Sequence, residues 1–181
     1  WAGREGGTVR SANSGILTGP WNPIAGHNWI QELNLIYATQ DVGAFADPYT
    51  GLYWPQRLEK SEVKVVEGTP ISKTLDWVSL EFVPEIKVPA DAWVDWNGET
   101  QTFVSAGEKH PDGITAKSVT TTTYPADMLE KIKYHDGSPL SVADFVLLMI
   151  MQFDTCDPKS AIYDETNVPN CDTFKSHFKG V

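Results

Sequence analysis

Basic residues are scarce in this chain of 181 residues. It has 14 Lys and Arg against 24 Asp and Glu, a formal net charge of −10, and no run of like charge. Nucleic acids and anionic membranes are bound by clusters of Lys and Arg. The composition therefore argues against either of them as a partner, and it is typical of many soluble proteins.

Long hydrophobic runs are also absent. The longest, Phe145 to Met151, is far shorter than the roughly 20 residues that cross a bilayer as a helix. The first residues, Trp1 to Gly7, lack the apolar core of a signal peptide. If the protein is exported, we expect this chain to be the processed form.

Only two cysteines are present, Cys156 and Cys171, 15 residues apart. In an oxidising compartment they would form a disulfide across a loop rich in Asp, Pro and Asn, and we favour this pairing. Two free cysteines in a reducing compartment are the alternative, since spacing alone does not establish a bond. A zinc site is disfavoured because there is no CxxC pair and the nearest histidine, His177, has no partner at zinc-ligand spacing.

No catalytic constellation is recognisable. The chain lacks a nucleophile elbow, an HExxH helix, a P-loop and a dinucleotide-binding glycine pattern. Acidic pairs such as Asp154 with Asp157 do not have the spacing of a calcium loop. The four histidines are scattered along the chain at His27, His110, His135 and His177. We therefore expect no enzyme activity, no cofactor and no functional metal.

Hydrophobic residues make up 41% of the chain, which is enough for the core of one domain. Polar and apolar alternation predicts strands, and helical spacing of apolar residues predicts helices. The predicted strands are 6–13, 62–66, 75–83, 92–96, 100–104 and 117–124. The predicted helices are about 28–40, a helix that starts after Ser141, and 170–178. This mixture predicts an α+β fold.

The stretch from Lys131 to Leu148 is the most informative part of the chain. Asp136-Gly137 predicts a tight turn, because glycine adopts positive φ at no steric cost. Ser141 is a candidate N-cap, and Asp144 stands three residues later in a capping-box arrangement, just before the apolar run. We expect a helix to begin here.

The same stretch resembles the signature of the family 5 extracellular solute-binding proteins, the peptide- and nickel-binding receptors of ABC importers. The resemblance rests on Lys133 to Leu140 followed by Ala143 to Val146, and more loosely on Gly6-Gly7-Thr8 and Asn22-Pro23. It implies that residues 1–181 are the N-terminal portion of a two-lobed, periplasmic-binding-protein-like fold of type II, cluster C. It covers about 6–37 and 117–181, and it implies a β-rich insertion at about 68–116.

The resemblance also implies a function and a place. The chain would be the substrate-binding component of an ABC transporter that captures oligopeptides or similar small solutes. Its partners would be the solute, the importer membrane subunits and a second lobe of the same protein, which this chain does not contain. It would work in the periplasm or on the extracellular face of the cytoplasmic membrane, with or without a lipid anchor on the full-length protein.

Candidate ligand-binding residues come from two loops that this resemblance points to. They are His27, Asn28 and Trp29 before the first helix, and Ser160 and Tyr163 after the signature helix. The alternatives stay open: Trp29 would equally suit a helix packing into the core, and Tyr163 would suit an ordinary surface loop.

A carbohydrate-binding module is the alternative function. The chain has seven tryptophans, and three of them lie in its β-rich middle. Trp77, Trp93 and Trp96 could together form a stacking platform for sugar rings.

Overall fold

The computed structural model describes residues 42–134 and 136–181. These belong to the second of two compact units, Asp41–Val181; the first is Trp1–Gln40. The predicted strand 6–13, the predicted helix 28–40 and the candidate residues His27, Asn28 and Trp29 lie outside the described residues, as does His135.

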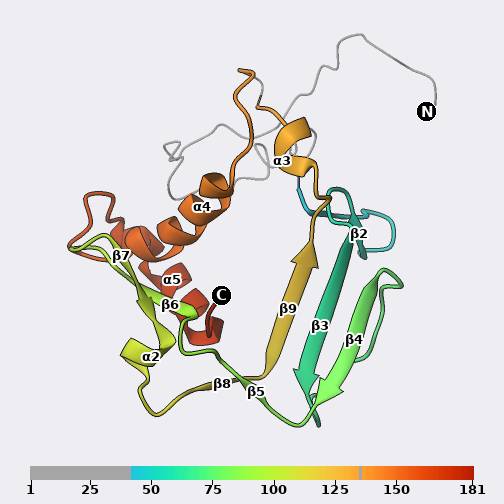
Figure 1. The fold of residues 1–181 in the computed structure, drawn as a ribbon, viewed down its shortest axis with the longest axis horizontal. Coiled ribbons are helices and arrows are strands. Elements are labelled where there is room, and N and C mark those ends of the chain that lie inside the picture. Colours follow the sequence, from blue (N-terminus) through green and yellow to red (C-terminus); the bar gives the residue numbers. More distant parts are fainter. Residues whose placement is uncertain (1–41, 135) are drawn as a thin grey trace, which may run out of the picture. The chain divides into compact units, whose positions relative to one another are not determined.

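Three strands form the largest sheet, in the order β4-β3-β9 (Figure 1). The central strand β3 (Lys60–Val66) pairs in parallel with β4 (Val78–Val83) and antiparallel with β9 (Ser118–Thr123). These strands confirm the predictions at 62–66 and 117–124. The strand predicted at 75–83 starts only at Val78, because a turn precedes it and the Val78 N–H bonds to the Leu75 carbonyl at 3.3 Å.

Short strand pairs make up the remaining sheets. The predicted strands at 92–96 and 100–104 are the hairpin β6 (Trp93–Asn97) and β7 (Thr102–Ser105). Four very short strands were not predicted: β1 (Ala44–Ala46) with β2 (Tyr53–Pro55), and β5 (Ile86–Lys87) with β8 (Thr115–Ala116).

Two longer helices follow the main sheet. Helix α4 (Val142–Asp154) begins directly after Ser141, as predicted, and α5 (Val168–His177) begins slightly earlier than predicted, with a proline in its first turn. Two single-turn helices, α2 (Ala106–Lys109) and α3 (Met128–Lys131), and the 3₁₀ turn η1 (Glu165–Asn167) complete the described part of the chain.

Apolar packing joins several of the described elements. Buried Ala92, Val94 and Ala106 form a small core beneath the β6–β7 hairpin. Phe153 of α4 contacts Phe174 of α5 and Phe178, at ring-centroid distances of 5.3 and 5.7 Å. The expected i, i+4 contact between Phe174 and Phe178 is present, with their rings stacked 4.9 Å apart.

The segment 68–116 is rich in strands and is bonded to the rest of the unit. Its strand β4 pairs with β3 of the main sheet, while its strands β5 and β8 pair with each other. The unit is therefore a mixed α/β structure with several small sheets and few helices, compatible with the expected α+β class.

Candidate binding site

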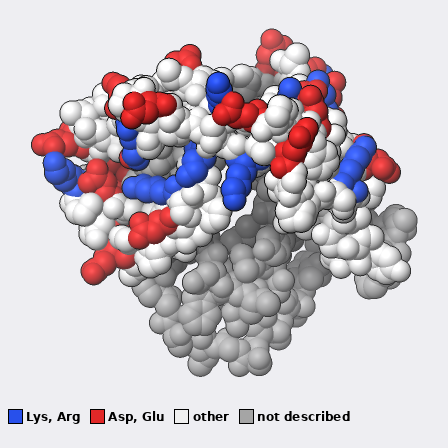
Figure 2. Space-filling model, turned by 90° about the horizontal axis from the view of Figure 1, so that it is seen from below, with Lys and Arg blue, Asp and Glu red and all other residues white. Residues whose placement is uncertain are grey.

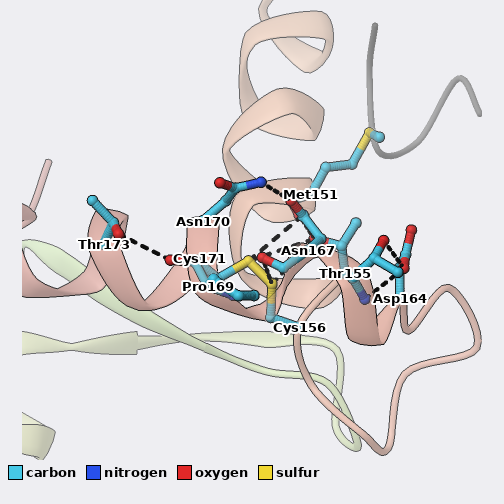
Figure 3. The surroundings of a disulfide bond; sticks show 10 residues. Met151, Thr155, Cys156, Asp164, Asn167, Pro169, Asn170, Cys171 and Thr173 are labelled. Carbon is cyan, nitrogen blue, oxygen red and sulfur yellow. Dashed lines mark hydrogen bonds between the residues drawn. A yellow bond between two sulfur atoms is a disulfide. The ribbon is translucent and has the colours of Figure 1, made fainter. Parts of the chain in front are cut away.

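A disulfide closes the loop between α4 and α5. Cys156 and Cys171 are bonded, with their Cα atoms 6.4 Å apart, which confirms the predicted pairing (Figure 3). Cys171 is buried and Cys156 is partly buried. The bond therefore ties the end of α4 to the first turns of α5 and holds the intervening loop between fixed ends.

Thr155 organises the polar side of this loop. Its hydroxyl donates to the Met151 carbonyl at 2.8 Å and accepts from Nδ2 of Asn167 at 2.9 Å. Its carbonyl accepts from the Asp164 N–H at 2.8 Å (Figure 3). Thr155 is only 1% exposed, so these bonds satisfy polar groups that water does not reach.

Ser160 and Tyr163, the two candidate residues on this loop, lie within a single turn. The Ser160 hydroxyl accepts from the Ile162 N–H at 3.1 Å, and the Ser160 carbonyl accepts from the Tyr163 N–H at 3.3 Å. The Tyr163 side chain is exposed at 40%. Ser160 thus shapes the turn, while Tyr163 presents its ring to a ligand or to solvent.

The tip of the β6–β7 hairpin contacts the same loop. The Gly98 N–H donates to Oδ2 of Asp157 at 3.1 Å, and Lys159 pairs with Glu99 at 2.6 Å. Asp157 also accepts from the Lys159 N–H at 3.0 Å. The loop that carries Ser160 and Tyr163 is therefore bonded to the hairpin that carries Trp93 and Trp96.

Two of the three candidate tryptophans share one aromatic cluster. Trp93 stacks on Phe103 with centroids 4.2 Å apart, and Trp96 meets Phe103 edge-on at 4.9 Å. A register shift between Trp93 and Asp95 lets both tryptophans, an odd and an even position of β6, reach the same phenylalanine. Trp77 makes a different contact, a hydrogen bond of 2.9 Å to the Tyr53 carbonyl.

One ion pair stabilises the base of the hairpin. Partial burial would raise the pKa of Asp95, but the Lys109 ammonium, 2.5 Å away, and the Trp96 N–H outweigh it and lower that pKa below its usual value. Asp95 is therefore a carboxylate at neutral pH and holds α2 against β6.

A groove that the sequence patterns did not predict lies between β9 and the C-terminal segment. Its volume is about 1150 Å³, and its walls come from three separate stretches, 84–92, 115–120 and 176–181, with Val66 beside them. Figure 2 shows the underside of the unit in Figure 1, where basic and acidic side chains are interspersed. No local motif marks the groove, because residues far apart in the sequence form it.

In residues 42–134 and 136–181 no three His, Cys, Asp or Glu side chains come together as metal ligands would. Within the same residues, no helix has the length and apolar character needed to cross a bilayer.

The chain matches no protein-family model, no curated protein and no solved structure. The candidate site is therefore defined by its own geometry: a disulfide-closed loop with an exposed tyrosine, bonded to a hairpin with an aromatic cluster.

Proposed function

We propose that this chain is the N-terminal portion of the substrate-binding component of an ABC importer, which captures oligopeptides or similar small solutes outside the cytoplasmic membrane. The observation that carries the proposal is the entry to α4. Gly137 adopts φ +89° in the turn, and Lys133 and Pro139 form an antiparallel bridge across it. The Asp144 carboxylate then accepts from both the N–H and the hydroxyl of Ser141, at 2.7 and 3.0 Å. This geometry agrees with the role that the family signature assigns to these residues.

The candidate site suits a binding role. The disulfide and the bonds of Thr155 hold the loop ends, so that little conformational entropy is lost when a ligand binds. Tyr163 offers apolar area and a hydroxyl at low entropic cost. In the proposal this loop lies on one wall of a cleft that closes against a second lobe of the same protein. His27, Asn28 and Trp29 stay candidate ligand residues, and they lie outside the described part of the chain.

The proposal includes partners and location. The membrane subunits of the importer would receive the solute, and the protein would work in the periplasm or on the extracellular face of the membrane, with or without a lipid anchor. It has no catalytic step and needs no cofactor.

The complete reading frame of the gene is the first test, because it should encode a second lobe after Val181. In the full-length protein, calorimetry with a mixture of short peptides should detect binding, and Tyr163→Ala should weaken it about tenfold. Tyr49→Ala removes a tyrosine that is 95% exposed on a different turn and should have no effect. Tight binding of those peptides at the Tyr163 site by residues 1–181 alone, or a frame without a second lobe, would overturn the proposal.

Carbohydrate binding is the second candidate, favoured by the pairing of Trp93 with Phe103. Trp93 is 40% exposed while its ring stacks on Phe103, so it is a rigid aromatic surface of the kind that sugars stack on. Retention on polysaccharide columns that Trp93→Ala abolishes and Trp77→Ala leaves unchanged would favour this function over the first.

A further inference from the structure

Among the strands of residues 42–134 and 136–181, none lies beside the outer edge of β9. The Val66 N–H bonds to the Lys117 carbonyl at 2.9 Å, and the register pairs Lys64 with Val119. In an antiparallel pair, every second residue directs both its N–H and its C=O toward the partner strand, so those of Lys117 and Val119 point toward β3. Strand alternation then directs the N–H and C=O groups of Ser118, Thr120 and Thr122 to the other side. Within residues 42–134 and 136–181 these groups have no hydrogen-bond partner. They are a ready template for one more strand.

This edge forms one wall of the groove of about 1150 Å³. Ser118, Val119 and Thr120 line it, and the opposite wall comes from 84–92 and 176–181. In Figure 1, β9 is the edge of the sheet nearer to the C-terminal segment. The volume is that of a ligand site, enough for a single extended chain and too small for a folded partner.

Lysines outnumber acidic residues along the groove, although the chain as a whole is acidic. Lys87, Lys117 and Lys179 line it, together with Glu85 and Asp91. Lys87 lies 3.5 Å from Glu85, and Lys179 donates to the Ser176 carbonyl at 3.1 Å. Lys117, directly before β9, has no ion-pair partner in the described part of the chain. It is placed to meet an anionic group beside the strand edge.

We propose that this groove binds an extended polypeptide segment that carries carboxylates, by adding it as a strand to the outer edge of β9. Backbone hydrogen bonds to Ser118, Thr120 and Thr122 hold the segment, and Lys117 pairs with one of its carboxylates. Apolar side chains along the groove, among them Val88 and Phe178, receive alternate residues of the segment. This site is separate from the Tyr163 loop and does not depend on the proposed transport function.

Fluorescence anisotropy of the 181-residue chain tests the proposal. The probe is a fluorescein-labelled peptide of about eight residues, the length of an ordinary strand, with alternating valine and glutamate. Thr120→Pro removes one outward N–H and leaves the bonds to β3 intact, because proline is tolerated where the N–H of an edge strand faces away. Thr120→Ala is the matched control, since it keeps that N–H.

Substitutions that change side-chain charge without altering the backbone test whether Lys117 pairs with a carboxylate of the peptide. Lys117→Glu should weaken binding about tenfold, while Lys73→Glu makes the same change of charge on an exposed loop outside the groove and should not. A peptide with lysine in place of glutamate should bind at least about tenfold more weakly. Circular dichroism would reveal whether Thr120→Pro folds. If it does not, the comparison of Lys117→Glu with Lys73→Glu tests the proposal.

The expected result is micromolar binding of the acidic peptide that Thr120→Pro and Lys117→Glu both reduce and the controls preserve. No binding, equal binding of the acidic and basic peptides, or binding that both variants leave unchanged would overturn the proposal. Concentration-dependent dimerisation that Thr120→Pro abolishes would also overturn it, because a second copy of this chain would then occupy the edge.

Discussion

The indole N–H of Trp96 donates a hydrogen bond of 3.0 Å to Oδ1 of Asp154. Trp96 belongs to β6, and Asp154, which is only 6% exposed, is the last residue of α4. The bond therefore connects the hairpin with the aromatic cluster to helix α4. It also supplies a donor to a carboxylate that water hardly reaches.

We expect Trp96→Phe to lower the free energy of unfolding by about 1–3 kcal/mol, because the buried Asp154 carboxylate loses its donor. Trp93→Phe is the matched control, since its indole N–H has no partner in the described residues and the smaller ring still stacks on Phe103. Urea unfolding measures both. Equal losses in the two variants would show that ring size, and not the hydrogen bond, is responsible.

Removing the disulfide should destabilise the chain by about 3 kcal/mol, the expected effect of a bridge across 15 residues. The variant is Cys156→Ala with Cys171→Ala, compared with the wild type in urea. Reductant should destabilise the wild type by a similar amount and leave the double variant unchanged. A reductant effect that persists without the cysteines would contradict this account.

The carboxylate of Asp144, which caps α4, should make the stability of the fold depend on pH. Hydrogen bonds from the N–H and hydroxyl of Ser141, and from the Tyr134 hydroxyl, lower the pKa of Asp144 below its usual 3.8. A group whose pKa is lowered on folding stabilises the fold above its unfolded pKa, and that stability is lost as the pH falls through the folded pKa.

We therefore expect Asp144→Asn to be less stable than the wild type near pH 6, with the difference shrinking as the pH falls below about 3.8. Chemical unfolding at several pH values measures the difference. Asp76→Asn removes an exposed carboxylate with no side-chain hydrogen bond in the described residues, and it is the control for the loss of one charge. A gap between Asp144→Asn and wild type that stays constant with pH would contradict the capping role.

Gly98 lies where the hairpin meets the loop, and a Cβ there would sit 2.5 Å from Oδ2 of Asp157 and 3.1 Å from Oδ1 of Asp154. We expect Gly98→Ala to separate the hairpin tip from the loop and to cost about 1–3 kcal/mol. Glu99→Ala is the control, because it removes only the exposed ion pair with Lys159, which should contribute less than about 1 kcal/mol. Comparable losses in the two variants would argue against crowding at Gly98.

Local patterns predicted the elements whose cause is local. Helix α4 begins after Ser141 because the capping bonds join residues only three positions apart. Strands β3 and β9 follow from alternation and from β-branched residues. The cysteine pairing was favoured for an oxidising compartment and is confirmed, although free cysteines remained an alternative until the structure placed the two sulfur atoms together.

The very short strands β1, β2, β5 and β8 escaped prediction for a physical reason. A segment of two or three residues has no periodicity to detect, and it becomes a strand only when a partner supplies its hydrogen bonds. The aromatic platform was predicted only in part. Residue type suggested Trp77, Trp93 and Trp96, but backbone register decided that Phe103 joins the last two and that Trp77 bonds to Tyr53.

The sequence by itself therefore determined the positions of α4 and the longer strands, the acidic charge and the resemblance on which the proposed transport function depends. Only the tertiary structure decided which strands pair, how the hairpin meets the Ser160–Tyr163 loop, and that the outer edge of β9 faces a lysine-lined groove. These features depend on hydrogen bonds and contacts between residues far apart in the chain, such as Trp96 and Asp154. Spacing along the sequence reports only the preferences of neighbouring residues, so it carries no direct signal for such contacts.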